Sequence, residues 1–158
     1  MTLPLEEQLV RKLIEKNWHI ACAESCTGGL VTSRIVNVAN ASHVLDVSFV
    51  TYANEAKTEY LGVSPDIISK YGVVSEEVVR EMAAGVAKAA FSEVGIAISG
   101  IAGPGGGTEK KPVGMVCFGF FINGTITTRT CQFGNPGRNE VRALSTEYAL
   151  STVLELIC

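Results

Sequence analysis

The chain has 158 residues, of which 47% are hydrophobic, and a formal net charge of −3. This length suits a core that needs no disulfide or metal support, so we expect residues 1–158 to form a single domain. The negative charge argues against a nucleic-acid partner, because neutralising phosphates needs a basic face, and the lack of an apolar run of transmembrane length argues against a membrane partner.

Blocks of helical and extended pattern alternate along the chain. The first block has apolar residues at the spacing of an amphipathic helix, and residues 94–99 are apolar throughout, as in a strand covered on both faces. Asn123-Gly124 is a two-residue hairpin signal. The expected elements are helices over 5–16, 28–38 and 54–61, a short helical turn from Ser64, helices over 76–90 (capped by Ser75) and 137–156, and strands over 19–23, 45–52, 94–99, 113–121 and 125–133.

This order of elements predicts an α/β fold. Helices that alternate with strands pack on both faces of one sheet. We therefore expect a three-layer α/β/α sandwich with a mixed, mostly parallel sheet and one antiparallel hairpin.

The segment Ala23-Glu24-Ser25-Cys26-Thr27-Gly28-Gly29 joins the first expected strand to the next helix. A strand end would fix Ser25, and the glycines would let a substrate approach the backbone closely. The start of the helix would direct free N–H groups and a positive dipole end toward a negative charge. We expect Thr27, Gly28 and Gly29 to contact a substrate, although a plain structural turn has the same pattern.

Lys57 is the candidate base for Ser25. Asn54 is a plausible N-cap for the helix after the 45–52 strand, which places Lys57 in the first helical turn. That position opposes the helix dipole, and both the dipole and burial would lower the pKa of the amine. A neutral amine is the base that a serine nucleophile requires. The alternative is a lysine on a solvated face.

Other nucleophiles and metal sites find less support. Cys26 adjoins Ser25, but neighbours on an extended segment point to opposite sides, so we interpret Cys26 as a buried neighbour. His19 and His43 lack the context of a Cys–His or Ser–His–Asp site, and no zinc-ligand spacing occurs, so no metal is expected. Glu24 either orients Lys57, caps the turn or is a solvated charge.

Cysteine usage and the N-terminus bear on the compartment. The five cysteines are odd in number and form no CxxC pair, which fits a reducing cytoplasm better than a disulfide framework. The first residues lack the basic start and apolar block of a signal peptide. We therefore expect a cytoplasmic protein.

A glycine-rich segment follows the apolar 94–99 strand, at the place where open α/β sheets bind ligands. Its backbone N–H groups could hold a phosphate or an oxyanion, although it lacks the Gly-Lys-Ser/Thr ending of a P-loop. A flexible connector over 105–111, with a solvated tip at 109–111, is the alternative. Arg138 follows a turn and suits an anionic group. The expected substrate contacts here are Ser99, Gly100, Ala102, Gly103 and Arg138.

These segments together resemble one protein family. The chain is similar to the nicotinamide mononucleotide (NMN) deamidases, which occur alone or as the C-terminal domain of competence/damage-inducible CinA proteins. The matching stretches are AESCTGG (23–29), VTYANEAK (50–57), GVVS (72–75), SGIAGPGGG (99–107), KPVG (111–114), Arg138 and Arg142.

The resemblance implies hydrolysis of the nicotinamide amide of NMN to nicotinate mononucleotide and ammonia. It also implies a homodimer and no cofactor. A Ser–Lys dyad assisted by a tyrosine would be formed by Ser25, Lys57 and Tyr52. The alternatives are a non-catalytic nucleotide-binding domain, which would not need this trio, and a Ser–Lys hydrolase of another small amide.

Overall fold

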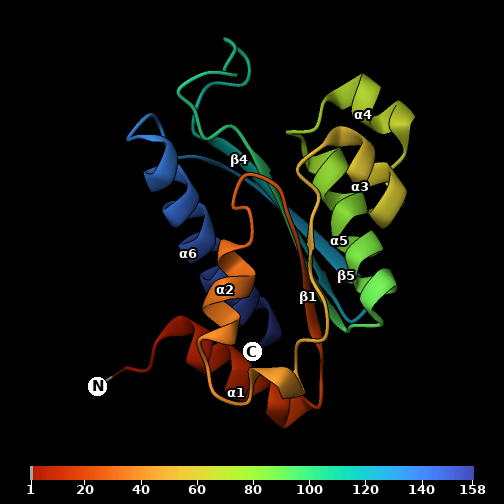
Figure 1. Cartoon of the computed structure of the whole chain (residues 1–158), viewed down its shortest axis with the longest axis vertical. Helices are drawn as coiled ribbons and strands as arrows, with labels where there is room; N and C mark the ends of the chain where they lie inside the picture. Colours follow the sequence, from red (N-terminus) through yellow and green to blue (C-terminus); the bar gives the residue numbers. More distant parts are fainter. Residues whose placement is uncertain (1) are drawn as a thin grey trace.

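Five strands form the central sheet of the computed structural model, which describes residues 2–158. The order across the sheet is β2-β1-β3-β4-β5, and Figure 1 shows the sheet between two groups of helices. β1 pairs in parallel with β2 and β3, whereas β4 is antiparallel to β3 and β5, so four of the five strands share one direction. The strands are β1 (Ile20–Glu24), β2 (Phe49–Val50), β3 (Val94–Gly100), β4 (Met115–Ile122) and β5 (Thr125–Gln132).

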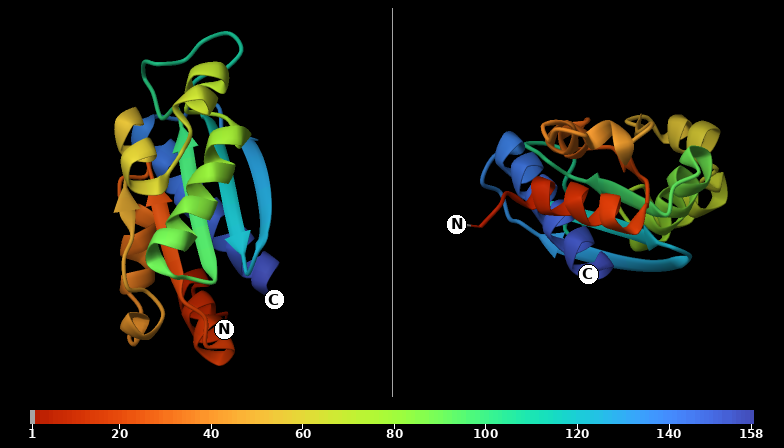
Figure 2. Two further views of the ribbon diagram at one scale, coloured as in Figure 1. Left: turned by 90° about the vertical axis from the view of Figure 1, so that its right-hand side faces the viewer. Right: turned by 90° about the horizontal axis from the view of Figure 1, so that it is seen from below.

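Helices cover both faces of this sheet. In Figure 2, left, α5 lies in front of the sheet and α6 behind it. Side chains of α1, α2 and α6 share one buried cluster with the sheet, and those of α3 and α5 share the other. The helices are α1 (Leu5–Lys16), α2 (Leu30–Val36), α3 (Asn54–Leu61), α4 (Pro65–Tyr71), α5 (Glu76–Ala90) and α6 (Arg138–Ile157), with a 3-10 turn at Ala41–His43.

The alternation along β1 shows how the sequence builds two cores. Ile20 and Cys22 pack into one cluster, and Ala21 and Ala23 into the other, because successive side chains of a strand point to opposite faces. A strand between two helical layers is therefore apolar throughout. The expected three-layer α/β/α sandwich with a mixed, mostly parallel sheet is confirmed.

The β4–β5 hairpin is also confirmed. Ile122 pairs with Thr125, leaving Asn123 and Gly124 as the two loop residues. Both have positive φ, of 46° and 101°, as a two-residue hairpin turn of type I′ requires.

Two local expectations at the sheet edge were wrong. The strand expected over 45–52 is only two residues long, Phe49–Val50. Before it, the Ser48 hydroxyl accepts the Cys22 N–H at 3.0 Å, so a side chain replaces the backbone ladder. The N-cap of α3 is Ala53 and not Asn54, which is the first helical residue and makes no capping bond.

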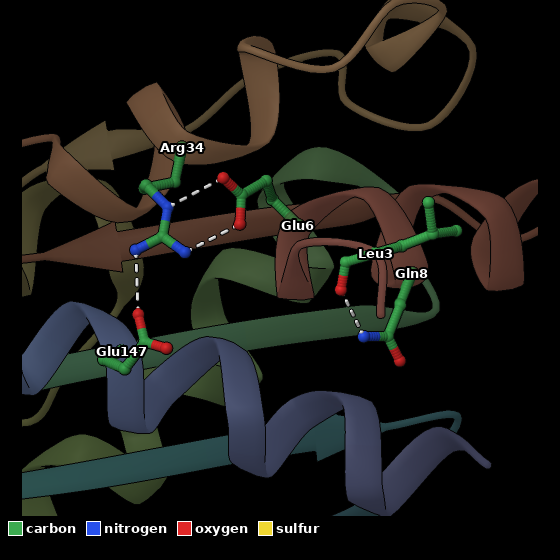
Figure 3. A network of polar contacts seen from close by, with 5 residues as sticks. All are labelled: Leu3, Glu6, Gln8, Arg34 and Glu147. Carbon is green, nitrogen blue, oxygen red and sulfur yellow. Dashed lines mark hydrogen bonds and ion pairs between the residues drawn. The ribbon is translucent and has the colours of Figure 1, made fainter. Parts of the chain in front are cut away.

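One helical layer is tied together by Arg34 of α2. Its guanidinium donates two hydrogen bonds to Glu6 of α1, at 2.6 and 3.1 Å, and a third to Glu147 of α6 at 3.0 Å (Figure 3).

In the part of the chain that the structure describes, no helix has the length and apolar character needed to cross a membrane.

Candidate active site

A pocket of about 420 Å³ lies at the edge of the sheet where β1 and β3 end. The connection between β3 and β4, drawn in green at the top of Figure 1, rises beside it. Segments far apart in the sequence meet here, because parallel strands end at the same edge of a sheet. Of the expected site residues, those lining the pocket are Ser25, Tyr52, Lys57, Ser99, Gly100, Ala102, Gly103 and Arg138.

The Lys57 amine is in hydrogen-bonding distance of the Ser25 hydroxyl. Nζ lies 3.3 Å from Ser25 Oγ and 2.7 Å from the Thr51 carbonyl oxygen. The Lys57 side chain is only 1% exposed, and within residues 2–158 it forms no ion pair with a carboxylate. Burial lowers the pKa of this amine from its usual value, because a charged group loses its hydration there.

The backbone on both sides of this pair is fixed by the sheet. The Ser25 N–H donates to the Ile98 carbonyl at 3.1 Å, which extends the β1–β3 ladder by one residue. The Thr51 N–H donates to the Glu24 carbonyl at 3.0 Å. The serine and the carbonyl that holds the lysine are thus positioned by neighbouring strands.

Tyr52 lies at the mouth of the pocket and is held by Arg138. Its hydroxyl accepts a hydrogen bond from Arg138 Nη2 at 2.9 Å, and Arg138 Nη1 donates to the Gly103 carbonyl at 2.7 Å. Tyr52 is 60% exposed. In this structure its hydroxyl is bonded to the arginine and not to Ser25 or Lys57.

Three expected substrate contacts, Thr27, Gly28 and Gly29, do not line the pocket. The reason is Glu24, which is fully buried and occupies the start of α2 in place of a substrate. Of the three interpretations of Glu24, the cap of the turn is the one observed. Its carboxylate accepts from the hydroxyls of Thr27 and Thr32 and from the N–H groups of Gly29, Val31 and Thr32, at 2.6–3.1 Å.

Arg142 braces the same turn from α6. Its Nε donates to the Cys26 carbonyl at 2.9 Å, and its Nη2 donates to the Thr27 carbonyl at 3.2 Å. Gly28 has a φ of 59°, and a side chain there would meet Arg142 Nη2 at 3.3 Å. The turn after Ser25 is therefore held from the helical layer opposite to that of Lys57.

Cys26 is buried, as interpreted from the sequence, and it is also among the residues that line the pocket beside Ser25. The chain does not stay extended after Ser25: it turns, with the Gly28 N–H donating to the Ser25 carbonyl at 3.0 Å. Burial raises the pKa of the Cys26 thiol to about 11. The thiolate, which is the nucleophilic form, is therefore scarce at neutral pH.

Lys111 is a site residue that the sequence did not reveal. Instead of forming a solvated tip, it is half-buried and lines the pocket. Its Nζ donates to the carbonyls of Tyr71 and Val74. Thr108 and Asn54 also line the pocket. The glycines after Ser99 marked this region as a candidate site, but the loop from 101 to 114 has no helical or strand period that would place the Lys111 side chain in the pocket.

The charge of the pocket differs from that of the chain. Lys57, Lys111 and Arg138 line it, and none of the 16 Asp and Glu residues does so. An anionic ligand is favoured in such a site, because the fixed positive charges of Lys111 and Arg138 lie beside low-dielectric walls. Among residues 2–158, His, Cys, Asp and Glu side chains form no group of three that could hold a metal ion.

Fold and site together define an α/β protein with a Ser–Lys pair in a cationic pocket. The model of the CinA C-terminal domain matches residues 2–157, and the chain belongs to this family. Nicotinamide-nucleotide amidohydrolase PncC of Enterobacter agglomerans is 46% identical over 151 residues, which cover 95% of this chain and 92% of that protein.

Longer relatives and solved structures agree with this assignment. A putative competence-damage inducible protein of Alkaliphilus oremlandii is 49% identical over 94% of this chain, but this chain spans only 36% of its length. The crystal structure of the competence/damage inducible protein CihA from Agrobacterium tumefaciens is 36% identical, with a TM-score of 0.90 and 99% of both chains covered. A competence or damage-inducible protein from Enterobacter asburiae is 35% identical, with a TM-score of 0.93, and covers 98% of this chain and 96% of its own.

Proposed function

We propose that this chain is an amidohydrolase that converts the carboxamide of NMN to nicotinate mononucleotide and ammonia. The observation that carries the proposal is the buried Lys57 amine, 3.3 Å from Ser25 Oγ, in a pocket with cations and no carboxylate. The similarity to a relative named nicotinamide-nucleotide amidohydrolase supports the choice of substrate.

Ser25 attacks the carboxamide in the first step. The neutral Lys57 amine takes the proton of Ser25 Oγ, and the oxygen forms a bond to the amide carbon. The negative charge that develops on the amide oxygen needs a nearby donor. The backbone N–H of Cys26 directly follows the nucleophile and, within residues 2–158, has no backbone acceptor, so we assign it this role.

Collapse of the tetrahedral intermediate releases ammonia. The Lys57 ammonium returns its proton to the leaving nitrogen as the carbon–nitrogen bond breaks, which leaves an ester on Ser25. Lys57, again neutral, then takes a proton from water, and the resulting hydroxide attacks the ester. The carbon–oxygen bond to Ser25 breaks, the serine regains its proton, and nicotinate mononucleotide leaves.

Tyr52 and Arg138 assist at the mouth of the pocket. Because Arg138 holds both the Tyr52 hydroxyl and the Gly103 carbonyl, it fixes one wall against which the pyridine ring and ribose can lie. In the described part of the chain its remaining N–H groups have no acceptor, so they can contact the substrate. We assign positioning of the substrate to this pair and proton transfer to Ser25 and Lys57.

The proposal is tested by ammonia release from NMN with the purified protein and its Ser25→Ala variant. We expect the wild type to turn over and Ser25→Ala to fall to background, because the only activated nucleophile is lost. Cys26→Ala is the comparison, and we expect it to stay within a few-fold of wild type, since its thiol is protonated. Activity in Ser25→Ala together with loss in Cys26→Ala would move the nucleophile to the cysteine.

A further inference from the structure

Lys111 is positioned like a ligand-binding residue and not like a loop tip. Its backbone N–H donates to Thr108 Oγ1 at 3.0 Å, and its carbonyl accepts the Thr108 N–H at 2.8 Å. This short turn leaves Glu109 and Lys110 exposed and directs Lys111 back to the protein. Its ammonium has three N–H donors, of which the carbonyls of Tyr71 and Val74 take two. The third donor has no acceptor within residues 2–158 and is available to a ligand in the pocket.

The wall that Lys111 meets is shaped to receive it. The two carbonyls belong to the end of α4 and to the segment before α5, on the face of the sheet opposite to α6 and Arg138. Gly72 lies between them, and a side chain at Gly72 would approach Lys111 Nζ to 3.1 Å. A glycine at this position therefore leaves space for the ammonium.

Lys111 and Arg138 thus reach the pocket from opposite helical layers. Arg138 is bonded to Tyr52, whereas Lys111 is bonded to the carbonyls of Tyr71 and Val74 and has no hydrogen bond to Ser25, Lys57, Tyr52 or Arg138. A substrate with a reactive amide at one end and an anion at the other needs a cation apart from the nucleophile. Lys111 meets this need.

Neutral donors line the same pocket as Lys111. Thr108 lines the pocket, and its hydroxyl proton stays available because its oxygen acts as the acceptor for the Lys111 N–H. The N–H groups of Gly105 and Gly106 have no acceptor within residues 2–158. Lys111 forms no ion pair with a carboxylate in that part of the chain. An ammonium, a hydroxyl and free backbone N–H groups are the donors that a phosphate monoester accepts.

We propose that Lys111, with Thr108 and the N–H groups of Gly105 and Gly106, binds the phosphate monoester of the substrate. Lys111 then determines the preference of the enzyme for a nucleotide over the corresponding nucleoside. The identity of the substrate rests on the proposed function, but the anion site does not. Binding the phosphate also orients the amide, so its loss lowers turnover as well as affinity.

The kinetic test compares Lys111→Met with Lys110→Met, which removes the same charge from the exposed neighbouring position. The readout is the ratio of kcat/KM for NMN to kcat/KM for nicotinamide riboside. We expect Lys111→Met to lower this ratio by about 10- to 100-fold, as for the loss of a charge-assisted contact, Lys111→Arg to retain most of it, and Lys110→Met to leave it at the wild-type value. If Lys111 only attaches the loop to the α4–α5 segment, both substrates lose rate in proportion and the unchanged ratio overturns the proposal.

A binding test separates this inference from the proposed function. The unfolding temperatures of wild type, Lys110→Met and Lys111→Met are measured in inorganic phosphate and in chloride of equal ionic strength. A ligand that binds the folded state raises the unfolding temperature, so we expect a larger phosphate-specific shift in wild type and Lys110→Met than in Lys111→Met. That result with no ammonia release from NMN would refute the amidase and retain the anion site. Equal shifts in all three proteins would refute the anion site itself.

Discussion

The amine of Lys57 is buried with two neutral acceptors, the Thr51 carbonyl and the Ser25 hydroxyl, and without a paired carboxylate. An unpaired buried charge is strongly unfavourable. Burial therefore shifts the amine toward its neutral form and lowers its pKa, while the charge of Glu55 acts in the opposite direction with smaller effect. A lysine in this environment contributes little to stability as a cation. Its neutral amine can instead accept a proton and act as a base.

The activity should follow the neutral fraction of Lys57. Because its pKa in the folded protein lies below the usual 10.5, kcat/KM for NMN should rise with pH and level off below that value. Lys57→Arg should be nearly inactive at every pH, since guanidinium does not give up its proton. The measurement is kcat/KM for NMN as a function of pH in both proteins. An active Lys57→Arg variant would show that the lysine acts only through its charge and not as the base.

The lowered pKa of Lys57 also makes the free energy of unfolding depend on pH. The unfolded chain binds more protons at Lys57 between the lowered pKa and 10.5, so the contribution of Lys57 to stability increases as pH rises through this window. Urea unfolding of the wild type and of Lys57→Met across this pH range should show this component of the pH dependence in the wild type only.

Ser25, Lys57 and Arg138 could be placed from the sequence because each lies at the border of a regular element. The positions of Thr27 and Lys111 could not. Thr27 does not line the pocket because its hydroxyl donates to the buried carboxylate of Glu24, which accepts five hydrogen bonds at the start of α2. Lys111 depends on how an aperiodic loop folds back on the α4–α5 segment. The homodimer and the cytoplasmic location stay predictions.

At the scale of elements, the turn from β1 to α2 is organised by one side chain. Glu24 is the last residue of β1, and its carboxylate satisfies three N–H groups at the start of α2. A negative group at a helix start also interacts favourably with the helix dipole. Because Ser25 directly follows Glu24, the carboxylate that caps the helix also fixes the backbone of the nucleophile.

Glu24→Gln should destabilise the protein although it nearly preserves the shape of the side chain. In the wild type, both carboxylate oxygens of Glu24 accept hydrogen bonds from nearby donors. The amide of glutamine places an NH₂ group, itself a donor, against some of these donors, so hydrogen bonds are lost. We expect the free energy of unfolding in urea to fall by about 2–3 kcal/mol. The control is Glu15→Gln on α1, whose side chain is 69% exposed and pairs only with Lys12. Similar small changes in both variants would show that Glu24 is not the organising contact.

The boundaries of helices could be predicted where apolar residues recur at helical spacing along the whole element. α1 and α5 begin and end where the apolar spacing and the Ser75 cap place them, and Ser75 Oγ accepts the Val78 N–H at 3.2 Å. β2 was overestimated because the Cys22 N–H is bonded to the Ser48 hydroxyl and not to a backbone carbonyl, so the ladder does not extend before Phe49. The apolar pattern of 45–52 reflects burial on one side, and burial does not require a hydrogen-bonded ladder.

At the scale of the molecule, the pocket draws on all three layers. Ser25 and Ser99 come from strand ends, Lys57 comes from α3 on one face, and Arg138 comes from α6 on the other. Arg142 of α6 also holds the turn after Ser25. The geometry of the site therefore depends on the packing of α6 against α1 and α2, which Arg34 links (Figure 3).

Arg34→Leu should lower stability by disconnecting this layer. The guanidinium makes two hydrogen bonds to Glu6 and one to Glu147, and the Glu6 side chain is only 15% exposed, so we expect a loss of about 1–2 kcal/mol in the free energy of unfolding. Arg11→Leu is the matched control, because its pair with Glu7 on α1 is solvated, with Arg11 64% exposed, and such pairs contribute at most about 1 kcal/mol.

The pH dependence of the same variant identifies the contact responsible. Hydrogen bonding to Arg34 lowers the pKa of Glu6, so its contribution is complete above the ordinary carboxyl pKa and is lost as the pH falls through the lowered value. Urea unfolding of wild type and Arg34→Leu should therefore show a stability difference at neutral pH that shrinks on acidification. A difference that stays constant down to acidic pH would mean that Arg34 stabilises the layer by apolar packing of its stem and not through Glu6.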